Sequence, residues 1–175
     1  RLLTYLSDRG HQVIDLEGLA HHRGSAFGGI GQAAQPTTEH FGNLLYWRWR
    51  EMDPSRPLWV EDESMNIGKV NLPENFFSRM RAAVTFFLDI PREVRAEFLV
   101  QEYASLDRAD LAAAIHRISK RLGGQRTSEA LDALEKKDFM RTAMITLEYY
   151  DRTYMKGLSR RDPETVILIP SDTVD

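Results

Sequence analysis

The chain has 175 residues, a formal net charge of −3 and 42% hydrophobic residues. This length suits one domain with its own core, and no apolar run approaches the roughly 20 residues of a membrane span, so we expect a soluble, cytoplasmic protein. The lack of cysteine excludes disulfides, thiolate metal sites and a cysteine nucleophile within these residues. The mild negative charge leaves any RNA contact to a local basic patch.

Short apolar strands alternate with helices in the first half of the chain. Leu2, Leu3 and Leu6 share a helical face, and Gly10 ends that opening helix. The following elements are predicted in order: a strand over residues 11–15, a glycine-rich loop to about residue 36, a helix over 41–52, a strand over 57–62, a turn-rich segment over 63–74 and a short helix over 73–81.

The second half is mostly helical. It is predicted to contain a strand over residues 83–90, helices over 91–103, 111–122, 127–134 and 139–154, and a last strand over 165–170. Four short apolar strands separated mostly by helices favour a three-layer α/β fold with a mostly parallel sheet. We expect one domain over residues 1–175, with a helical elaboration over about 91–156.

Acidic side chains follow the first two predicted strands. Asp15 and Glu17 follow the first strand, and Glu61, Asp62 and Glu63 follow the second. In neighbouring parallel strands these carboxylates could hold a hydrated Mg²⁺ or accept a hydrogen bond from a substrate hydroxyl. Acids are also common where strands reach water, so a structural role is an equal alternative.

A dense set of hydrogen-bond donors lies in the glycine-rich loop. It comprises His21, His22, Arg23, Gly24 and Ser25. Glycine lets a backbone approach an anion while imidazolium, guanidinium and hydroxyl groups donate to it, so this stretch predicts an oxyanion site. A zinc site is disfavoured because adjacent histidines project differently and no cysteine assists. A flexible loop with incidental donors is the structural alternative.

A basic cluster surrounds the glycine pair at residues 123–124. Arg117, Lys120, Arg121 and Arg126 place four positive charges within ten residues, which suits a phosphate or RNA clamp. A solvated helix face is the alternative.

Three aromatic residues belong to the predicted helix over residues 41–52. Tyr46, Trp47 and Trp49 could stack on a base, but their helical spacing favours the core, where we expect them. The chain has no G-x-x-x-x-G-K-[ST] loop, and no serine–histidine–acid set is oriented as a triad.

Several long motifs resemble one family. The stretches "DLEGLAHHRGSAFGG", "QPT", "PLWVEDESMNIGKVNLPE" and "KRLGGQR" resemble the tRNA 2-selenouridine synthase family, specifically its carboxyl-terminal P-loop domain. The resemblance covers nearly the whole chain. It implies a sheet of P-loop NTPase type that here lacks its first strand and P-loop, which in the family lie upstream with a rhodanese-like domain that carries an essential cysteine. We therefore expect a fragment that is inactive alone.

The resemblance also implies a reaction. Such enzymes convert 2-thiouridine to 2-selenouridine at the wobble position of bacterial tRNAs, with selenophosphate as donor and a geranylated intermediate made from geranyl diphosphate. The implied partners are tRNA, these small phosphorylated co-substrates and the upstream rhodanese domain of the same parent protein, with no membrane. Mg²⁺ at Asp15 or Glu61 is an optional cofactor, and no metal site is predicted firmly.

Roles can be carried over residue by residue. The resemblance implies anion contacts by residues 21–25 and places Asp15 and Glu17 toward the acceptor or a metal. Glu61 and Asp62 stand where a P-loop protein keeps its metal-associated acid, and Ser64 and Asn66 line the following substrate turn. The basic cluster becomes the RNA or phosphate clamp. Two alternatives stay open: a small-molecule or nucleoside kinase, because "FFLDIPREVRAEF" is also typical of those enzymes, and a noncatalytic RNA-binding domain.

Overall fold

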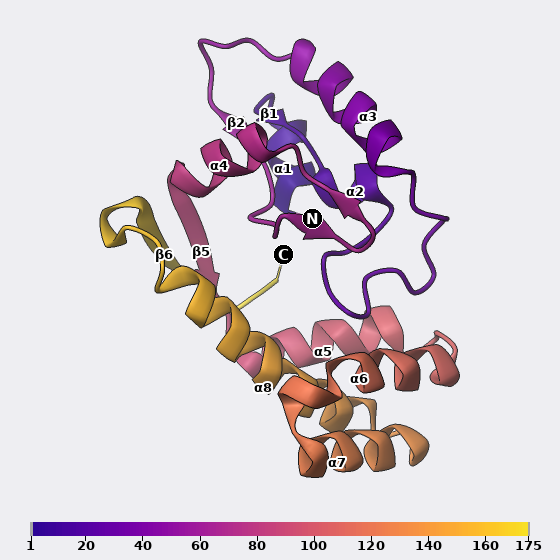
Figure 1. The fold of residues 1–175 in the computed structure, drawn as a ribbon. Coiled ribbons are helices and arrows are strands. Elements are labelled where there is room, and N and C mark those ends of the chain that lie inside the picture. The colour runs from indigo at the N-terminus through magenta and orange to yellow at the C-terminus, as the bar shows by residue number, and fades with distance from the viewer. Residues whose placement is uncertain (1, 175) are drawn as a thin grey trace. The chain divides into compact units, whose positions relative to one another are not determined.

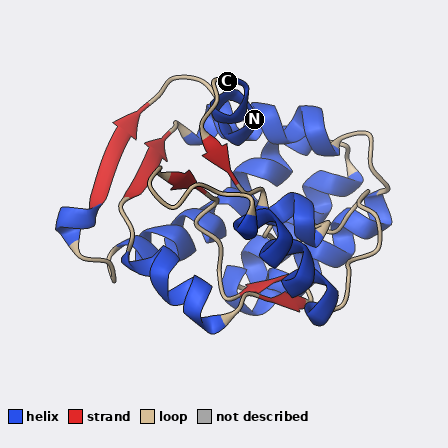
Figure 2. Cartoon of the chain, turned by 90° about the horizontal axis from the view of Figure 1, so that it is seen from above, coloured by secondary structure: helices blue, strands red, loops and turns tan. Residues whose placement is uncertain are grey.

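The structure is a computed structural model that describes residues 2–174. The chain divides into two compact units, one up to Arg81 and one from Ala82 to Val174. Both units contain helices and short strands (Figures 1 and 2). The predicted α/β class is therefore confirmed. No helix within the described residues is both long enough and apolar enough to cross a membrane.

The first unit combines one parallel and one antiparallel strand pair with helices. Its elements are α1 (Leu2–Asp8), β1 (Gln12–Val13), α2 (Leu16–Ala20), α3 (Thr38–Arg50), β2 (Leu58–Trp59), β3 (Asn66–Ile67), β4 (Val70–Asn71) and α4 (Glu74–Ala82). β1 and β2 are parallel, with Gln12 opposite Leu58 and Val13 opposite Trp59. β3 and β4 form a hairpin in which Gly68, at φ +61°, takes the first turn position.

The core of this unit joins α2, α3 and the hairpin. Leu16, Phe41, Ile67 and Val70 are fully buried, and Ile14 is 1% exposed. Neither α2 nor the hairpin was among the elements predicted from the sequence. α2 has five residues and the hairpin strands two each, too short for a periodic apolar pattern to develop.

The aromatic residues of α3 correct a prediction. Tyr46, Trp47 and Trp49 are 59%, 57% and 46% exposed, whereas Phe41 and Leu45 are buried. The expectation that all three aromatic side chains enter the core was wrong. Phe41 and Leu45 are four residues apart and occupy the inward face, so residues immediately after Leu45 turn away from it. The helix carries more aromatic residues than one face can bury.

The second unit contains a parallel strand pair and most of the long helices. Its elements are β5 (Thr85–Asp89), α5 (Arg92–Tyr103), α6 (Arg108–Leu122), α7 (Gly124–Glu135), α8 (Phe139–Leu158), the 3₁₀ turn η1 (Pro163–Thr165) and β6 (Val166–Pro170). β5 and β6 pair from Thr85–Val166 to Asp89–Pro170. α7 packs against both α6 and α8, and α5 packs against α8 (Figure 1).

The second-unit predictions hold apart from element boundaries. α7 begins at Gly124, three residues before its predicted start, because Gly123 at φ +96° breaks the chain and the helix starts directly after it. The Thr127 hydroxyl then donates to the Gly123 carbonyl at 2.8 Å within the helix. All four predicted strands exist, and each pairs in parallel with one other within its own unit.

Candidate functional site

Four carboxyl groups gather where β1 and β2 end. They belong to Asp15 and Glu17 after β1 and to Glu61 and Glu63 after β2. Because the strands are parallel, the segments that follow them leave the same edge of the sheet. The acids of the two predicted strand ends are thus brought together by strand pairing alone.

Two of these acids also support the first turn of α2. Asp15 is its N-cap residue, and the Asp15 Oδ1 atom accepts a hydrogen bond from the Gly18 N–H at 2.6 Å. The Glu61 Oε2 atom accepts one from the Leu16 N–H at 2.9 Å. Helix-terminal N–H groups have no partner inside the helix, so these carboxylates satisfy them. One role of the acids is therefore to fix the chain after β1.

Shared protons explain how the four acids can lie together. Burial, and after it a hydrogen bond with Glu63, raise the pKa of Glu17 to about 8. Burial likewise raises the pKa of Glu61 to about 7, with a contribution from a hydrogen bond to Asp15. Burial also raises the pKa of Glu63, which is 9% exposed. Like charges this close cannot all ionise, so near neutral pH the cluster retains protons.

The donor set suits Mg²⁺ in its chemistry but not in its arrangement. Oxygen ligands are those that Mg²⁺ prefers. Within residues 2–174, however, no three or more histidine or acidic side chains are placed to hold one metal ion. Backbone N–H groups and the hydrogen bonds between carboxyl groups occupy the same oxygens. The arrangement therefore fits proton sharing better than metal coordination.

A tight turn separates Asp62 from this cluster. The Glu63 N–H donates to the Glu61 carbonyl at 2.9 Å, which leaves Asp62 at the apex of a three-residue turn. The Asp62 carboxylate pairs instead with Arg81 of α4, at 3.1 Å. Of the three acids predicted at this strand end, Glu61 and Glu63 therefore lie in the cluster and Asp62 does not.

The glycine-rich loop lies directly against the acids. Gly24 adopts φ +66°, and a Cβ atom at this position would collide with the Glu63 carboxylate. Only glycine permits both this backbone conformation and this close approach. The loop predicted as an oxyanion site thus faces carboxyl groups, which repel an anion unless they are protonated.

Part of the loop's donor capacity is used internally. The Arg23 N–H donates to the Gly28 carbonyl at 3.0 Å, and the Gly28 N–H donates to the Ser25 carbonyl at 2.9 Å. The Ser25 hydroxyl oxygen accepts from the Phe27 N–H at 3.2 Å. The segment is therefore an ordered turn held by its own backbone, and Ser25 helps to shape it.

The two histidines point in different directions, as expected for adjacent residues. His21 adopts φ 50° at the end of α2, and its Nδ1 atom lies 2.9 Å from the Ala34 carbonyl oxygen. The His22 ring lies between glycines: an added Cβ at Gly28 would be 3.0 Å from its Cε1 atom, and one at Gly68 would be 2.7 Å from its Cδ2 atom. Both rings are held in place, one at the loop surface and one beneath the loop.

Gln35 links the loop to the β3–β4 hairpin through hydrogen bonds. Its amide nitrogen donates to the Ala20 carbonyl at 3.0 Å and the Ile67 carbonyl at 2.9 Å, and its amide oxygen accepts from the Lys69 N–H at 2.8 Å. The sequence analysis used this glutamine only as part of the "QPT" motif. This partly buried side-chain amide therefore links the loop to the hairpin through three backbone partners.

The predicted substrate turn leads into this hairpin. The Ser64 hydroxyl donates to the Asn66 carbonyl at 2.5 Å, and the Leu72 N–H donates to the Met65 carbonyl at 2.9 Å. Ser64 therefore stabilises the turn, and the exposed Asn66 opens β3.

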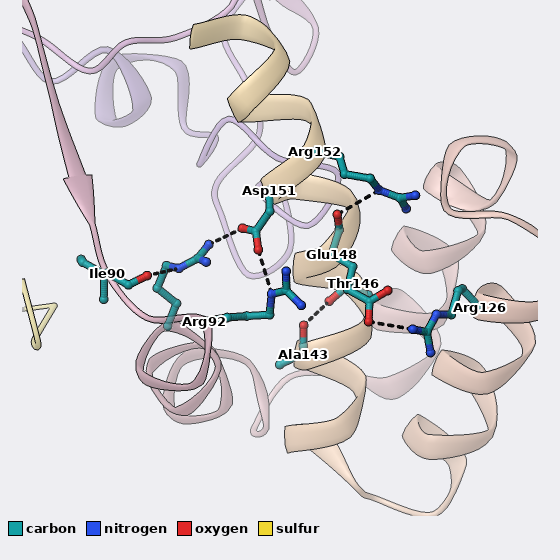
Figure 3. Close-up of polar contacts among 9 residues, drawn as sticks. Ile90, Arg92, Arg126, Ala143, Thr146, Glu148, Asp151 and Arg152 are labelled. Carbon is teal, nitrogen blue, oxygen red and sulfur yellow. Dashed lines mark hydrogen bonds and ion pairs between the residues drawn. The ribbon is translucent and has the colours of Figure 1, made fainter. Parts of the chain in front are cut away.

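The predicted basic clamp belongs to the second unit. Arg126 is bound by two acids at 2.9 Å each, Glu129 and Glu148, the latter shown in Figure 3. Arg121 donates to the Tyr149 hydroxyl at 3.2 Å. Arg117 and Lys120 are exposed on α6. Arg126 would have to exchange its acidic partners before it could contact a phosphate.

The sequence of the chain matches one family over nearly its whole length. The family is described as the tRNA 2-selenouridine synthase AAA domain, and its sequence model matches residues 2–174. The chain belongs to this family. Its acidic cluster, glycine-rich loop and Gln35 all lie within the matched residues.

Curated relatives carry the same family name. The tRNA 2-selenouridine synthase of Nitrosomonas europaea is 31% identical over 92% of this chain and 54% of its own length. Those of Shewanella loihica and Hydrogenovibrio crunogenus are 32% and 35% identical, over 86% and 81% of this chain. The chain spans about half the length of these relatives. No solved structure matches it.

Proposed function

We propose that this chain is the domain of a tRNA 2-selenouridine synthase in which paired carboxyl groups move protons during the replacement of sulfur by selenium in tRNA. The observation that carries the proposal is the Glu17–Glu63 pair at the end of parallel strands, with a Glu17 pKa of about 8. A group that titrates near neutral pH can both donate and accept a proton under working conditions.

The proposed chemistry requires a group that can both accept and donate a proton. Attachment of a geranyl group from geranyl diphosphate to the sulfur of 2-thiouridine releases a proton from the base. Attack by the selenium of selenophosphate forms the carbon–selenium bond and expels a geranyl thiolate, which takes up a proton. Water then cleaves the phosphorus–selenium bond and releases phosphate. A carboxyl pair that holds one proton can accept the first and supply the second, returning to its starting state.

The loop beside the pair is proposed to bind the phosphorus-containing group. Arg23 is exposed in the loop, and Gly24 brings the backbone against Glu63. An anion there is favoured by protonated carboxyl groups, because protonation removes the like charge. We further propose that the parallel strand pairs of this chain are those of a P-loop NTPase-type fold. The exposed apolar residues of the β5–β6 pair support this, since parallel sheets are normally covered on both faces.

Matched substitutions test the acid–base role in the full-length protein. Glu17→Gln and Glu61→Gln preserve shape and hydrogen bonding but abolish proton exchange, so selenation of tRNA, measured by mass spectrometry of its nucleosides, is expected to fall by about 100-fold or more. Asp62→Asn is the control, because Asp62 pairs with Arg81 outside the cluster. Turnover that is equal in all three variants would refute the role.

The two alternative functions predict different outcomes. A small-molecule kinase would consume ATP in the presence of small acceptors and would not require tRNA. A noncatalytic RNA-binding domain would tolerate Glu17→Gln without loss of turnover while retaining RNA affinity.

A further inference from the structure

The outward face of α3 carries two aromatic side chains that the core does not use. Tyr46 and Trp47 are 59% and 57% exposed, although tryptophan is on average a highly buried residue in folded proteins. They lie on the side of the helix opposite the buried Phe41 and Leu45. Neither residue contributes to the acidic site described above, so their exposure needs another explanation.

Arginine accompanies these rings. Arg50 lies one helical turn beyond Tyr46 and Trp47, and its guanidinium is 5.3 Å from the centre of the Trp47 ring. Arg48 is also exposed, and its contact with Glu51 is long, at 3.8 Å, between two solvent-exposed side chains. Such a pair is weak and readily exchanged for another anion. The end of α3 therefore presents two aromatic rings and two positive charges within five residues.

The geometry leaves the rings available for stacking. The Tyr46 and Trp47 ring planes make an angle of 66° with their centres 5.9 Å apart, so the two rings do not stack on each other. Aromatic faces beside arginine are the features with which proteins hold unstacked bases, while the guanidinium attracts the adjoining phosphate. A duplex hides its base faces and could use only the charges.

We propose that Tyr46, Trp47 and Arg50 form a stacking surface for bases of single-stranded RNA, such as the loop of a tRNA. The inference rests on the proposed function for its partner and adds a second contact to it, separate from the acidic cluster. RNA is favoured over a protein partner because the rest of the outward face is polar, with Glu39, His40 and Asn43 exposed or partly so, rather than broadly apolar.

The test measures binding rather than turnover. Fluorescein-labelled single-stranded oligouridylate and an RNA duplex of equal length are titrated with the full-length protein, and affinity is read from fluorescence anisotropy. Trp47→Ala is expected to weaken binding of the single strand by roughly 10-fold, and Trp47→Phe, which keeps a ring, much less. Tyr154→Ala, which removes another exposed tyrosine, from α8 (54% exposed), is the matched control and should bind like the wild type.

Several results would overturn the inference. The inference fails if Trp47→Ala binds the single strand as tightly as the wild type does. It also fails if Trp47→Ala loses equal affinity for single strand and duplex, because that result would indicate binding through charge alone. A changed oligomeric state with unchanged RNA affinity would assign the surface to a protein contact instead. If the wild type selenates tRNA but Trp47→Ala binds the single strand as tightly as the wild type does, only this inference is overturned. Absence of wild-type selenation overturns the proposed function and leaves the binding result interpretable.

Discussion

Glu17 should make the stability of the first unit depend on pH. Its pKa is raised from 4.5 to about 8 in the folded state, mainly by burial and then by the hydrogen bond with Glu63. Between these values the folded state holds a proton that the unfolded state has lost. The stabilisation is therefore complete below about pH 4.5 and is lost as the pH rises through about 8.

The size of the effect follows from the two pKa values. One pKa unit is equivalent to about 1.4 kcal/mol, so the difference sets an upper limit of about 5 kcal/mol. Glu17 is only partly buried, and solvent screens its charge. We therefore expect the free energy of unfolding to fall by on the order of 2 kcal/mol between about pH 5 and pH 8.5 on account of Glu17.

Glu17→Gln tests this reasoning directly. The variant cannot lose a proton, so it should show a shallower decline and be more stable than the wild type at about pH 8.5, with little difference at about pH 5. Urea unfolding can be followed by tryptophan fluorescence, because all three tryptophans, Trp47, Trp49 and Trp59, lie in the first unit. The measurement uses metal-free buffer, with Asp62→Asn as control. Identical pH profiles for wild type and Glu17→Gln would refute the raised pKa.

Three further predictions concern stability. Gly24→Ala should lower the free energy of unfolding by more than about 2 kcal/mol in urea titrations, because it strains a positive φ and collides with Glu63, whereas Gly10→Ala, at φ +78° in open space, should cost only about 1 kcal/mol. Gln35→Ala should cost about 2 kcal/mol or more by the same measurement, since three backbone groups lose their partner. Asp151→Asn should destabilise the second unit by about 1–3 kcal/mol, because two arginines of α5 pair with that carboxylate at 2.8 and 2.6 Å. Circular dichroism of the helices would follow its unfolding. An unchanged unfolding midpoint in any of these variants would contradict the corresponding contact.

The same carboxylate has a pH signature opposite to that of Glu17. Burial acts to raise the pKa of Asp151, but hydrogen bonds from Arg95 and Arg92 outweigh it and hold the pKa below its usual value. Its contribution is therefore present above the unfolded pKa and is lost as the pH falls through the folded one. Figure 3 shows the Asp151 carboxylate of α8 paired with Arg92.

The strands could be predicted because each is a local apolar run. Leu58 and Trp59, and the stretch from Phe86 to Leu88, lie in runs that need no tertiary information to be recognised. Parallel pairing then followed from the helices between the strands. The short helix α2 could not be found in this way, because its five residues are too few to show a periodic apolar pattern.

The direction in which side chains point was harder to predict than the helix or sheet edge on which they lie. Helical spacing identified α3, but it could not tell that Phe41 and Leu45 alone fill the inward face and leave Trp47 in solvent. In the same way, the run from Glu61 to Glu63 placed acids at the correct edge, while the tight turn that sends Asp62 to Arg81 depends on one backbone hydrogen bond. Tertiary contacts determine these side-chain directions, and the spacing of residues in the sequence does not reveal them.

The closeness of an acidic pair to a glycine-rich loop has a chemical consequence. Ionised carboxylates would repel a diphosphate or selenophosphate at the loop, whereas protonated ones can donate hydrogen bonds to it. Because burial keeps a proton on Glu17 up to about pH 8, an anion bound at the loop as proposed would meet less negative charge at neutral pH. Anion affinity should therefore decline as the pH rises through about 8 in the wild type. The affinity should not change with pH in Glu17→Gln. A wild-type affinity that also stays constant with pH would show that anion binding at the loop does not depend on protonation of the acids.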